Sequence, residues 1–140
     1  MNISEIMHTV LTTVTMDHTL GQAREIMKIK KIRHLLVMDG SDLVGVITDR
    51  DVRSHVSHRI NTQAESKSDH DTLETKVHQT MTRELITASP DTSIAEAARL
   101  IVDNKIGCLP IINKDGSTAG IITDSDFLKH IAREADKEAE

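Results

Sequence analysis

The 140-residue sequence carries 17 Lys and Arg against 22 Asp and Glu, so its formal net charge is −5 with the eight histidines neutral. This length suits one globular domain, and the net acidity argues against non-specific binding to nucleic-acid phosphates. Aromatic residues make up only 1% of the chain, which argues against the base-stacking platforms of single-strand binders.

Several other functional classes find no support in the sequence. Cys108 is the only cysteine, so neither an intrachain disulfide nor a cysteine-rich zinc cluster can form. No apolar run approaches the roughly 20 residues of a membrane helix, and we expect a cytoplasmic protein without membrane contact. No nucleophile with an adjacent base, phosphate-binding glycine loop or metal-hydrolase helix is found, so we expect neither catalysis nor a metal cofactor.

The two halves of the chain repeat each other with a shift of 74 residues. The residues that recur unchanged are Met7/Met81, Leu11/Leu85, Thr13/Thr87, Asp17/Asp91, Ala23/Ala97, Lys31/Lys105, Ile32/Ile106 and Leu35/Leu109. After a one-residue insertion near Asp115-Gly116 the shift becomes 75. The repeat predicts two copies of one supersecondary unit.

Each copy predicts the order strand, helix, strand, strand, helix. The first helices begin at Thr19 and Ser93, where Gln22 and Glu96 stand at capping-box spacing. Two apolar runs follow in each copy and are split by a turn dipeptide, which favours a hairpin. These runs and turns are 35–38, Asp39-Gly40 and 43–47 in the first copy, then 109–112, Asp115-Gly116 and 119–122 in the second. The second helices begin at Thr48 and Thr123.

Composition sets the expected boundaries. We expect the first copy over residues 1–57, an exposed polar linker over 58–73, the second copy over 74–132, and a charged, fraying tail over 133–140. Methionines at core-like positions are interpreted as packing residues, and Cys108 as a small buried residue. His55 and His58 have helical i, i+3 spacing, but no carboxylate or cysteine completes a metal site, so exposed histidines are favoured.

Each copy ends in Gly-apolar-apolar-Thr-x-x-Asp, which runs from Gly45 to Asp51 in the first copy and from Gly120 to Asp126 in the second. With the preceding hairpins, this pattern resembles a pair of cystathionine-β-synthase (CBS) domains, called a Bateman module, and is similar to stand-alone bacterial proteins of the acetoin-utilisation type. The resemblance implies an α+β fold in which two pseudo-twofold-related β-α-β-β-α repeats form one compact module. It also implies a homodimer.

The resemblance further implies two clefts for an adenine nucleotide, which would be AMP, ADP or ATP. The motif aspartate of one copy would hold the ribose, and the first strand and second-strand entry of the other copy would meet the adenine and phosphates. One cleft would combine Thr123, Ser125 and Asp126 with Thr12, Thr13, Arg33 and His34. The other would combine Thr48, Arg50 and Asp51 with Ile86, Thr87, Gly107 and Cys108.

The chemistry of these residues suits that role. An ionised carboxylate can accept both hydroxyls of a ribose diol, and a helix N-terminus attracts phosphate. Arg33 and His34 have no basic counterparts in the second copy, so we expect two inequivalent sites, with the more highly charged nucleotide in the Asp126 cleft. The expected function is regulatory: ligand binding would alter contacts with a partner protein that the sequence does not identify.

Two alternatives remain open. Thr-x-x-Asp is also a helix-capping pattern, so the chain could be a structural dimerisation module with empty clefts. Nucleic-acid binding through the basic stretch 28–33 ranks last, because one basic patch on an acidic, aromatic-poor chain offers little support.

Overall fold

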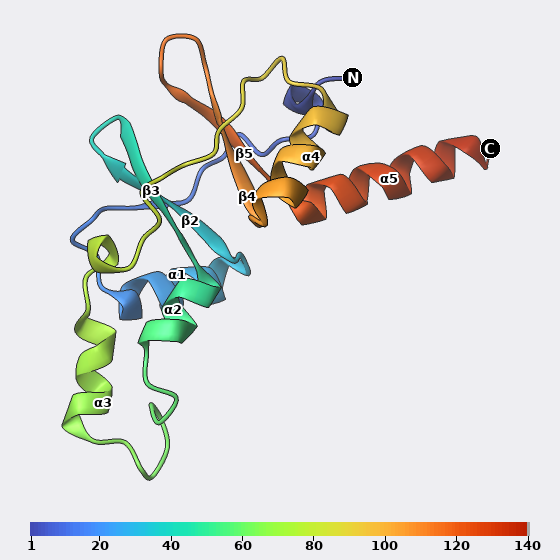
Figure 1. Cartoon of the computed structure of the whole chain (residues 1–140). Coiled ribbons are helices and arrows are strands. Elements are labelled where there is room, and N and C mark those ends of the chain that lie inside the picture. Colours follow the sequence, from blue (N-terminus) through green and yellow to red (C-terminus); the bar gives the residue numbers. More distant parts are fainter. Residues whose placement is uncertain (140) are drawn as a thin grey trace. The chain divides into compact units, whose positions relative to one another are not determined.

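The computed structural model describes residues 1–139, which form two compact units of mixed helix and strand (Figure 1). Unit 1 comprises Met1–Leu11 and the described chain from Ile86 onward, and unit 2 comprises Thr12–Leu85. Each unit therefore joins the body of one repeat to the short opening segment of the other repeat.

Unit 2 contains a three-stranded sheet in the order β1-β2-β3, made by Thr13–Val14, His34–Asp39 and Asp42–Thr48. β1 runs parallel to β2, and β2 runs antiparallel to β3. Helices α1 (Leu20–Lys30) and α2 (Asp49–His55) complete the predicted order for the first copy. The apolar side chains of these elements form one core, which consists of Val14, Leu20, Ala23, Met27, Leu35, Val37, Ile47, Val52, Val77 and Met81.

Unit 1 repeats this arrangement with α4 (Ile94–Asn104), β4 (Cys108–Ile112), β5 (Thr118–Thr123) and α5 (Asp124–Glu138). β4 and β5 form an antiparallel hairpin, and the N-terminal 3₁₀ turn Ile3–Glu5 packs beside them. Its core contains Ile3, Ala97, Ile101, Leu109, Ile111 and Ile122. α5 continues the helix through the charged segment that follows residue 132.

The first strand of the second copy differs from the prediction, because it is reduced to a parallel bridge between Ala88 and Ile111. In unit 2 the Leu36 N–H donates to the Thr12 carbonyl at 3.4 Å, within the β1–β2 pairing. Pro110 occupies the position of Leu36 and has no N–H to donate, so this hydrogen bond cannot form in unit 1.

Several local predictions are confirmed. Thr19 caps α1 in a reciprocal box with Gln22, and the Ser93 hydroxyl accepts the Glu96 N–H at 3.1 Å. Gly40 and Gly116 adopt positive φ angles of 61° and 89° in the two hairpin turns, as the Asp-Gly dipeptides predict. Cys108 and Met81 are both buried.

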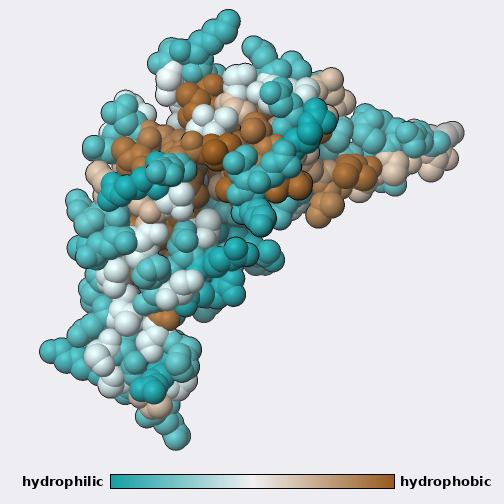
Figure 2. Space-filling model, in the orientation of Figure 1, coloured by the Kyte–Doolittle hydropathy of each residue, from teal (hydrophilic) through white to brown (hydrophobic). Residues whose placement is uncertain are grey.

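The polar segment between the repeats contains a short helix, α3 (Lys67–Asp71), that the sequence reading did not predict. Ser66 caps this helix in a reciprocal box with Asp69, whose other carboxylate oxygen accepts the Ser57 hydroxyl at 2.8 Å. Hydrogen bonds from the Ser66 N–H and the Ser57 hydroxyl hold the pKa of Asp69 below its usual value of 3.8. The segment is hydrophilic over most of its surface in Figure 2 and joins 3₁₀ turns at Thr72–Glu74 and Val77–Gln79.

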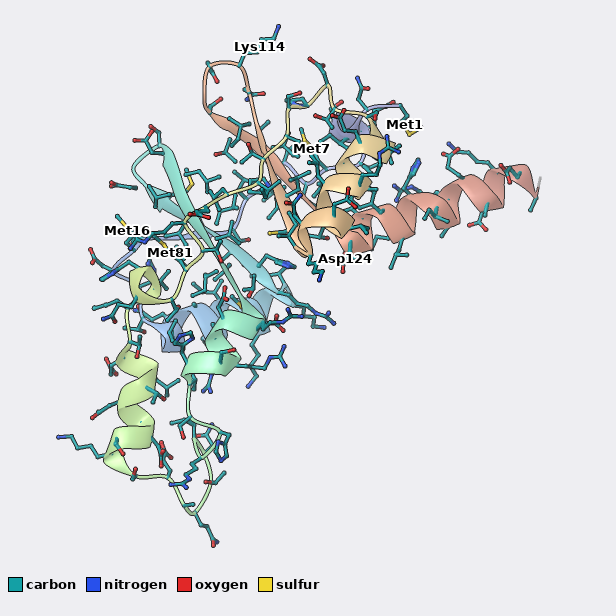
Figure 3. All side chains as sticks on the ribbon, in the orientation of Figure 1. Met1, Met7, Met16, Met81, Lys114 and Asp124 are labelled. Carbon is teal, nitrogen blue, oxygen red and sulfur yellow. The ribbon has the colours of Figure 1, made fainter. Side chains whose placement is uncertain are left out.

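Two glycines of the repeated motif allow the opening segment of a repeat to pack closely against a hairpin strand in each unit. Gly120 lies against the N-terminal segment, and a Cβ atom there would be 2.5 Å from the His8 carbonyl oxygen and 3.0 Å from Met7 Sδ. Gly45 lies against the equivalent segment, where a Cβ would be 2.7 Å from Met81 Sδ and 3.0 Å from the Thr82 carbonyl oxygen. Figure 3 shows Met7 in unit 1 and Met81 beside Met16 in unit 2.

We expect Gly120→Ala to lower the free energy of unfolding by about 1–3 kcal/mol, because the added methyl group meets a paired backbone. Gly45→Ala should cost less, because its nearest neighbour is a flexible methionine side chain. Urea unfolding of both variants measures the difference. Equal and negligible losses would contradict this account of the two glycines.

Candidate functional site

The repeated motif ends where a hairpin strand passes into a helix, and this junction gathers several predicted site residues in each unit. In unit 2, His34 pairs with Thr48 across β2 and β3, and the Asp49 N–H donates to the Arg33 carbonyl at 2.9 Å. Thr48 is the N-cap of α2, and Asp51 lies in its first turn. We call Thr48 and Asp51 the Asp51 corner.

In the Asp51 corner, carboxylate and hydroxyl bond reciprocally to the backbone. Asp51 Oδ2 accepts the Thr48 N–H at 2.9 Å, and Thr48 Oγ1 accepts the Asp51 N–H at 3.1 Å. Asp51 is half-buried, and within residues 1–139 its Oδ1 has no hydrogen-bond partner. The carboxylate therefore caps α2 with one oxygen and keeps the acceptor capacity of the other.

We call Thr123, Asp126 and His8 the Asp126 corner, which lies in unit 1 at the start of α5. Asp126 Oδ2 accepts the Thr123 N–H at 2.8 Å and the Thr123 hydroxyl at 3.3 Å. The His8 Nε2 atom lies 2.6 Å from Asp126 Oδ1. Asp126 is only 3% exposed, whereas His8 is 57% exposed. Both oxygens of this carboxylate therefore have partners within the chain.

The remaining predicted residues lie near these junctions or on the strands beside them. In unit 2, Thr12 is half-buried, Thr13 is exposed on β1, and Arg33 and Arg50 are exposed. In unit 1, Thr87 and Ser125 are exposed, Ile86 and Gly107 are half-buried, and buried Cys108 pairs with Thr123 across β4 and β5. Each predicted cleft combines residues of both units, and that combination stays a prediction.

Sequence reasoning did not single out His8. The repeat held a signal for it, because Met7-His8 aligns with Met81-Thr82 and the two copies differ at the second position. The backbone bridges are equivalent: His8 pairs with Ile121, and Thr82 pairs with Val46. Only the nature of the side chain distinguishes the two corners at this position.

His55 has a structural partner of its own. Its Nδ1 lies 2.8 Å from the Asp51 carbonyl oxygen, one turn earlier in the chain.

Across residues 1–139, no group of three or more His, Cys, Asp or Glu side chains is arranged to hold a metal ion. In the same part of the chain, no helix combines the length and apolar character needed to cross a membrane.

Comparison with known proteins places these junctions in a recognised domain. The sequence matches the CBS-domain family over residues 3–58 and 76–133, which includes both copies of the repeat. The chain belongs to the CBS domain family, and it contains two such domains.

Curated relatives carry this pair within longer chains. The chain is 36% identical over 118 residues to inosine-5'-monophosphate dehydrogenase of Methanocaldococcus jannaschii. This match covers 84% of the chain but only 21% of the enzyme. It is 31% identical over 130 residues to homoserine O-acetyltransferase of Methanohalobium evestigatum, covering 92% of this chain and 24% of that protein. The chain thus spans about a quarter or less of these relatives, and matches only part of each enzyme.

Solved structures share the fold over nearly the whole chain. The acetoin utilization protein AcuB from Vibrio cholerae superposes with a TM-score of 0.81 at 26% identity, over 100% of this chain and 97% of that one. CBSX2, solved in complex with AMP, gives 0.78 at 25% identity over 96% and 98% of the two chains. The predicted CBS-pair fold and its likeness to acetoin-utilisation-type proteins are confirmed.

We expect Asp51→Ala to destabilise the chain by about 1 kcal/mol, the usual cost of losing a helix cap. Asp126→Ala should lower the stability further, because it also removes the contact between His8 and the buried carboxylate. Chemical denaturation compares these variants with Asp49→Ala, whose side chain lies in the same turn and forms only a 3.5 Å contact with Arg53. Losses in the reverse order would contradict the assigned hydrogen bonds.

Proposed function

We propose that this chain is a regulatory module that binds adenine nucleotides (AMP, ADP or ATP) through the Asp51 and Asp126 corners. The observation that carries the proposal is the Asp51 carboxylate, which uses one oxygen for its helix and has the other unbonded within residues 1–139. The hydrogen bond between the motif aspartate and the backbone N–H of the motif threonine recurs in the second repeat. A CBS protein of the same fold has been solved with AMP.

The chemistry of the corner suits a ribose. A vicinal diol presents two O–H donors, and an ionised carboxylate has about four acceptor positions of which the helix cap uses one. Hydrogen bonds to a charged acceptor are stronger than those between neutral groups, so the ribose would gain from a carboxylate rather than an amide. The cap also fixes the direction of the carboxylate before any ligand arrives, which lowers the ordering cost of binding.

The capping geometry was the basis of the alternative, in which the chain is only a structural module. Helix capping and ligand binding use different oxygens of Asp51, so the cap does not remove the acceptor needed for binding. The structural alternative predicts that replacing the aspartate changes stability alone. The nucleotide proposal predicts a loss of affinity that a stability change does not explain.

Regulation requires that different nucleotides stabilise different states of the protein. A ligand shifts an equilibrium only through its differential affinity for two states, so AMP and ATP must bind with different preference to act as signals. Arg33 and His34 beside the Asp51 corner are candidates to meet phosphates. Their pairing with Asp126, the identity of the partner protein and the cytoplasmic location remain predictions from sequence.

Isothermal titration calorimetry with AMP, ADP and ATP tests the proposal. We expect measurable binding by the unmodified chain, and at least a tenfold loss at one site in Asp51→Asn, because the amide keeps the helix acceptor but offers a weaker group to the ribose. Matched controls are Asp49→Asn and Asp124→Asn, which remove one charge each from the same helix turns. Figure 3 labels Asp124 at the start of α5.

Unchanged affinity in both Asp51→Asn and Asp126→Asn would favour the structural alternative. Equal losses in Asp49→Asn and Asp51→Asn would indicate a general charge effect and would also contradict a specific ribose contact. Absence of heat from all three nucleotides at millimolar concentration would remove the proposed function.

We also propose that two copies associate through the exposed apolar face of unit 1. On α5, Leu128 and Ile131 are 66% and 62% exposed, and apolar surface is visible along this helix at the right of Figure 2. Beside it lies a groove of about 510 Å³, lined mainly by Met1, Ile94, Ala95, Ala98, Phe127 and Ile131. Burying such a face against a second copy removes apolar area from water.

Sedimentation velocity checks this association. We expect a dimer for the unmodified chain and a monomer for the Leu128→Asp, Ile131→Asp double variant, because two charges would be buried in an apolar contact. Val10→Asp is the matched control, since Val10 is 89% exposed but lies in a loop outside this face. A monomeric unmodified chain, or a dimer that survives both aspartates, would overturn the proposal.

A further inference from the structure

We infer that His8 is a resident occupant of the Asp126 corner, which a nucleotide must displace before its ribose reaches the carboxylate. This inference rests on the proposed function and adds a specific difference between the two sites. Asp126 Oδ1 is the atom equivalent to the unbonded oxygen of Asp51, and the His8 ring lies 2.6 Å from it. A carboxylate only accepts hydrogen bonds, so Nε2 must carry the hydrogen in this contact.

The backbone holds His8 at this position. Its N–H donates to the Ile121 carbonyl and its carbonyl accepts the Ile121 N–H, both at 2.9 Å. Gly120 permits this close approach, since a Cβ atom would be 2.5 Å from the His8 carbonyl oxygen. With its backbone fixed to β5, the imidazole needs little further ordering to reach the start of α5.

The other repeat supplies an internal comparison. Thr82 occupies the position of His8, and its N–H and carbonyl exchange hydrogen bonds with Val46 at 2.9 and 3.0 Å. A threonine side chain is much shorter than an imidazole, and Asp51 Oδ1 has no hydrogen-bond partner among residues 1–139. Two corners with the same backbone therefore differ in whether the second carboxylate oxygen is occupied.

This difference has a direct consequence for ligand affinity. A nucleotide at the Asp51 corner meets an available acceptor, whereas one at the Asp126 corner must first break a short contact to a buried carboxylate. His8 is 57% exposed, so it can swing into water and recover hydrogen bonds there, which makes the contact displaceable. We therefore expect the Asp51 corner to fill at lower nucleotide concentration than the Asp126 corner.

The test isolates each corner and then exchanges the two residues. In an Asp51→Asn background, AMP titrated by calorimetry reports the Asp126 corner, and His8→Thr should raise its affinity about tenfold. In an Asp126→Asn background, Thr82→His should lower the affinity of the Asp51 corner, while His8→Thr should leave it unchanged. Thermal unfolding of each variant without ligand verifies that it is folded.

An unchanged AMP affinity on His8→Thr in the Asp51→Asn background overturns the inference while leaving the proposed function in place. If that background shows no binding before the change, the inference requires that His8→Thr restore it. Absence of heat in the unmodified chain and in every variant removes the proposed function, and the inference with it.

A second measurement follows His8 itself. Long-range ¹H–¹⁵N spectra of the full chain report which ring nitrogen carries hydrogen, and we expect the Nε2 signal to shift on AMP saturation in the Asp51→Asn background. A large calorimetric signal with unchanged His8 resonances would overturn displacement, because binding would then leave the imidazole on Asp126.

Discussion

The bond between the motif aspartate and the backbone N–H three residues earlier determines how each repeat ends. It joins Thr48 to Asp51 and Thr123 to Asp126, at 2.9 and 2.8 Å. The N–H belongs to the last residue of a hairpin strand, so this contact lies where the strand ends and the helix begins. It also fixes the orientation of the carboxylate. A neutral side chain of similar size could cap the helix, but it would not place a negative charge at this junction. The functional chemistry thus arises from a group that the fold already requires.

Duplication supplied two such junctions, and a glycine in each allows a neighbouring segment to cover it. Gly120 admits the His8 backbone and Gly45 admits that of Thr82, so the same packing brings different side chains to the two carboxylates. The opening segment of one repeat completes the unit formed by the other. His8 and Thr82 are not members of the two apolar clusters, so a change of side chain at either position can alter one site while the cores stay the same.

The sequence was informative wherever a local rule decides the structure. Capping spacing located the starts of α1 and α4, and Asp-Gly pairs located both hairpin turns, because these features depend on residues close in the chain. The reduced first strand of the second copy could have been inferred from Pro110, whose effect appears only when it is set against Leu36. The contact between His8 and Asp126 spans most of the chain, so no spacing rule could identify it. α3 was not predicted because it has no apolar stripe, although Ser66 and Asp69 form a capping pattern.

Helix capping and ligand binding do not exclude each other at a Thr-x-x-Asp motif, because a carboxylate has two oxygens and the cap occupies one. The competition instead concerns the second oxygen, and there the two repeats differ. At Asp51 it has no partner within residues 1–139, and at Asp126 it contacts an imidazole from outside the motif. A buried carboxylate without partners is costly, so His8 also lowers the penalty of keeping Asp126 at 3% exposure. A contact that stabilises the empty corner must weaken ligand binding by the same free energy, because the ligand can bind only after that contact is lost.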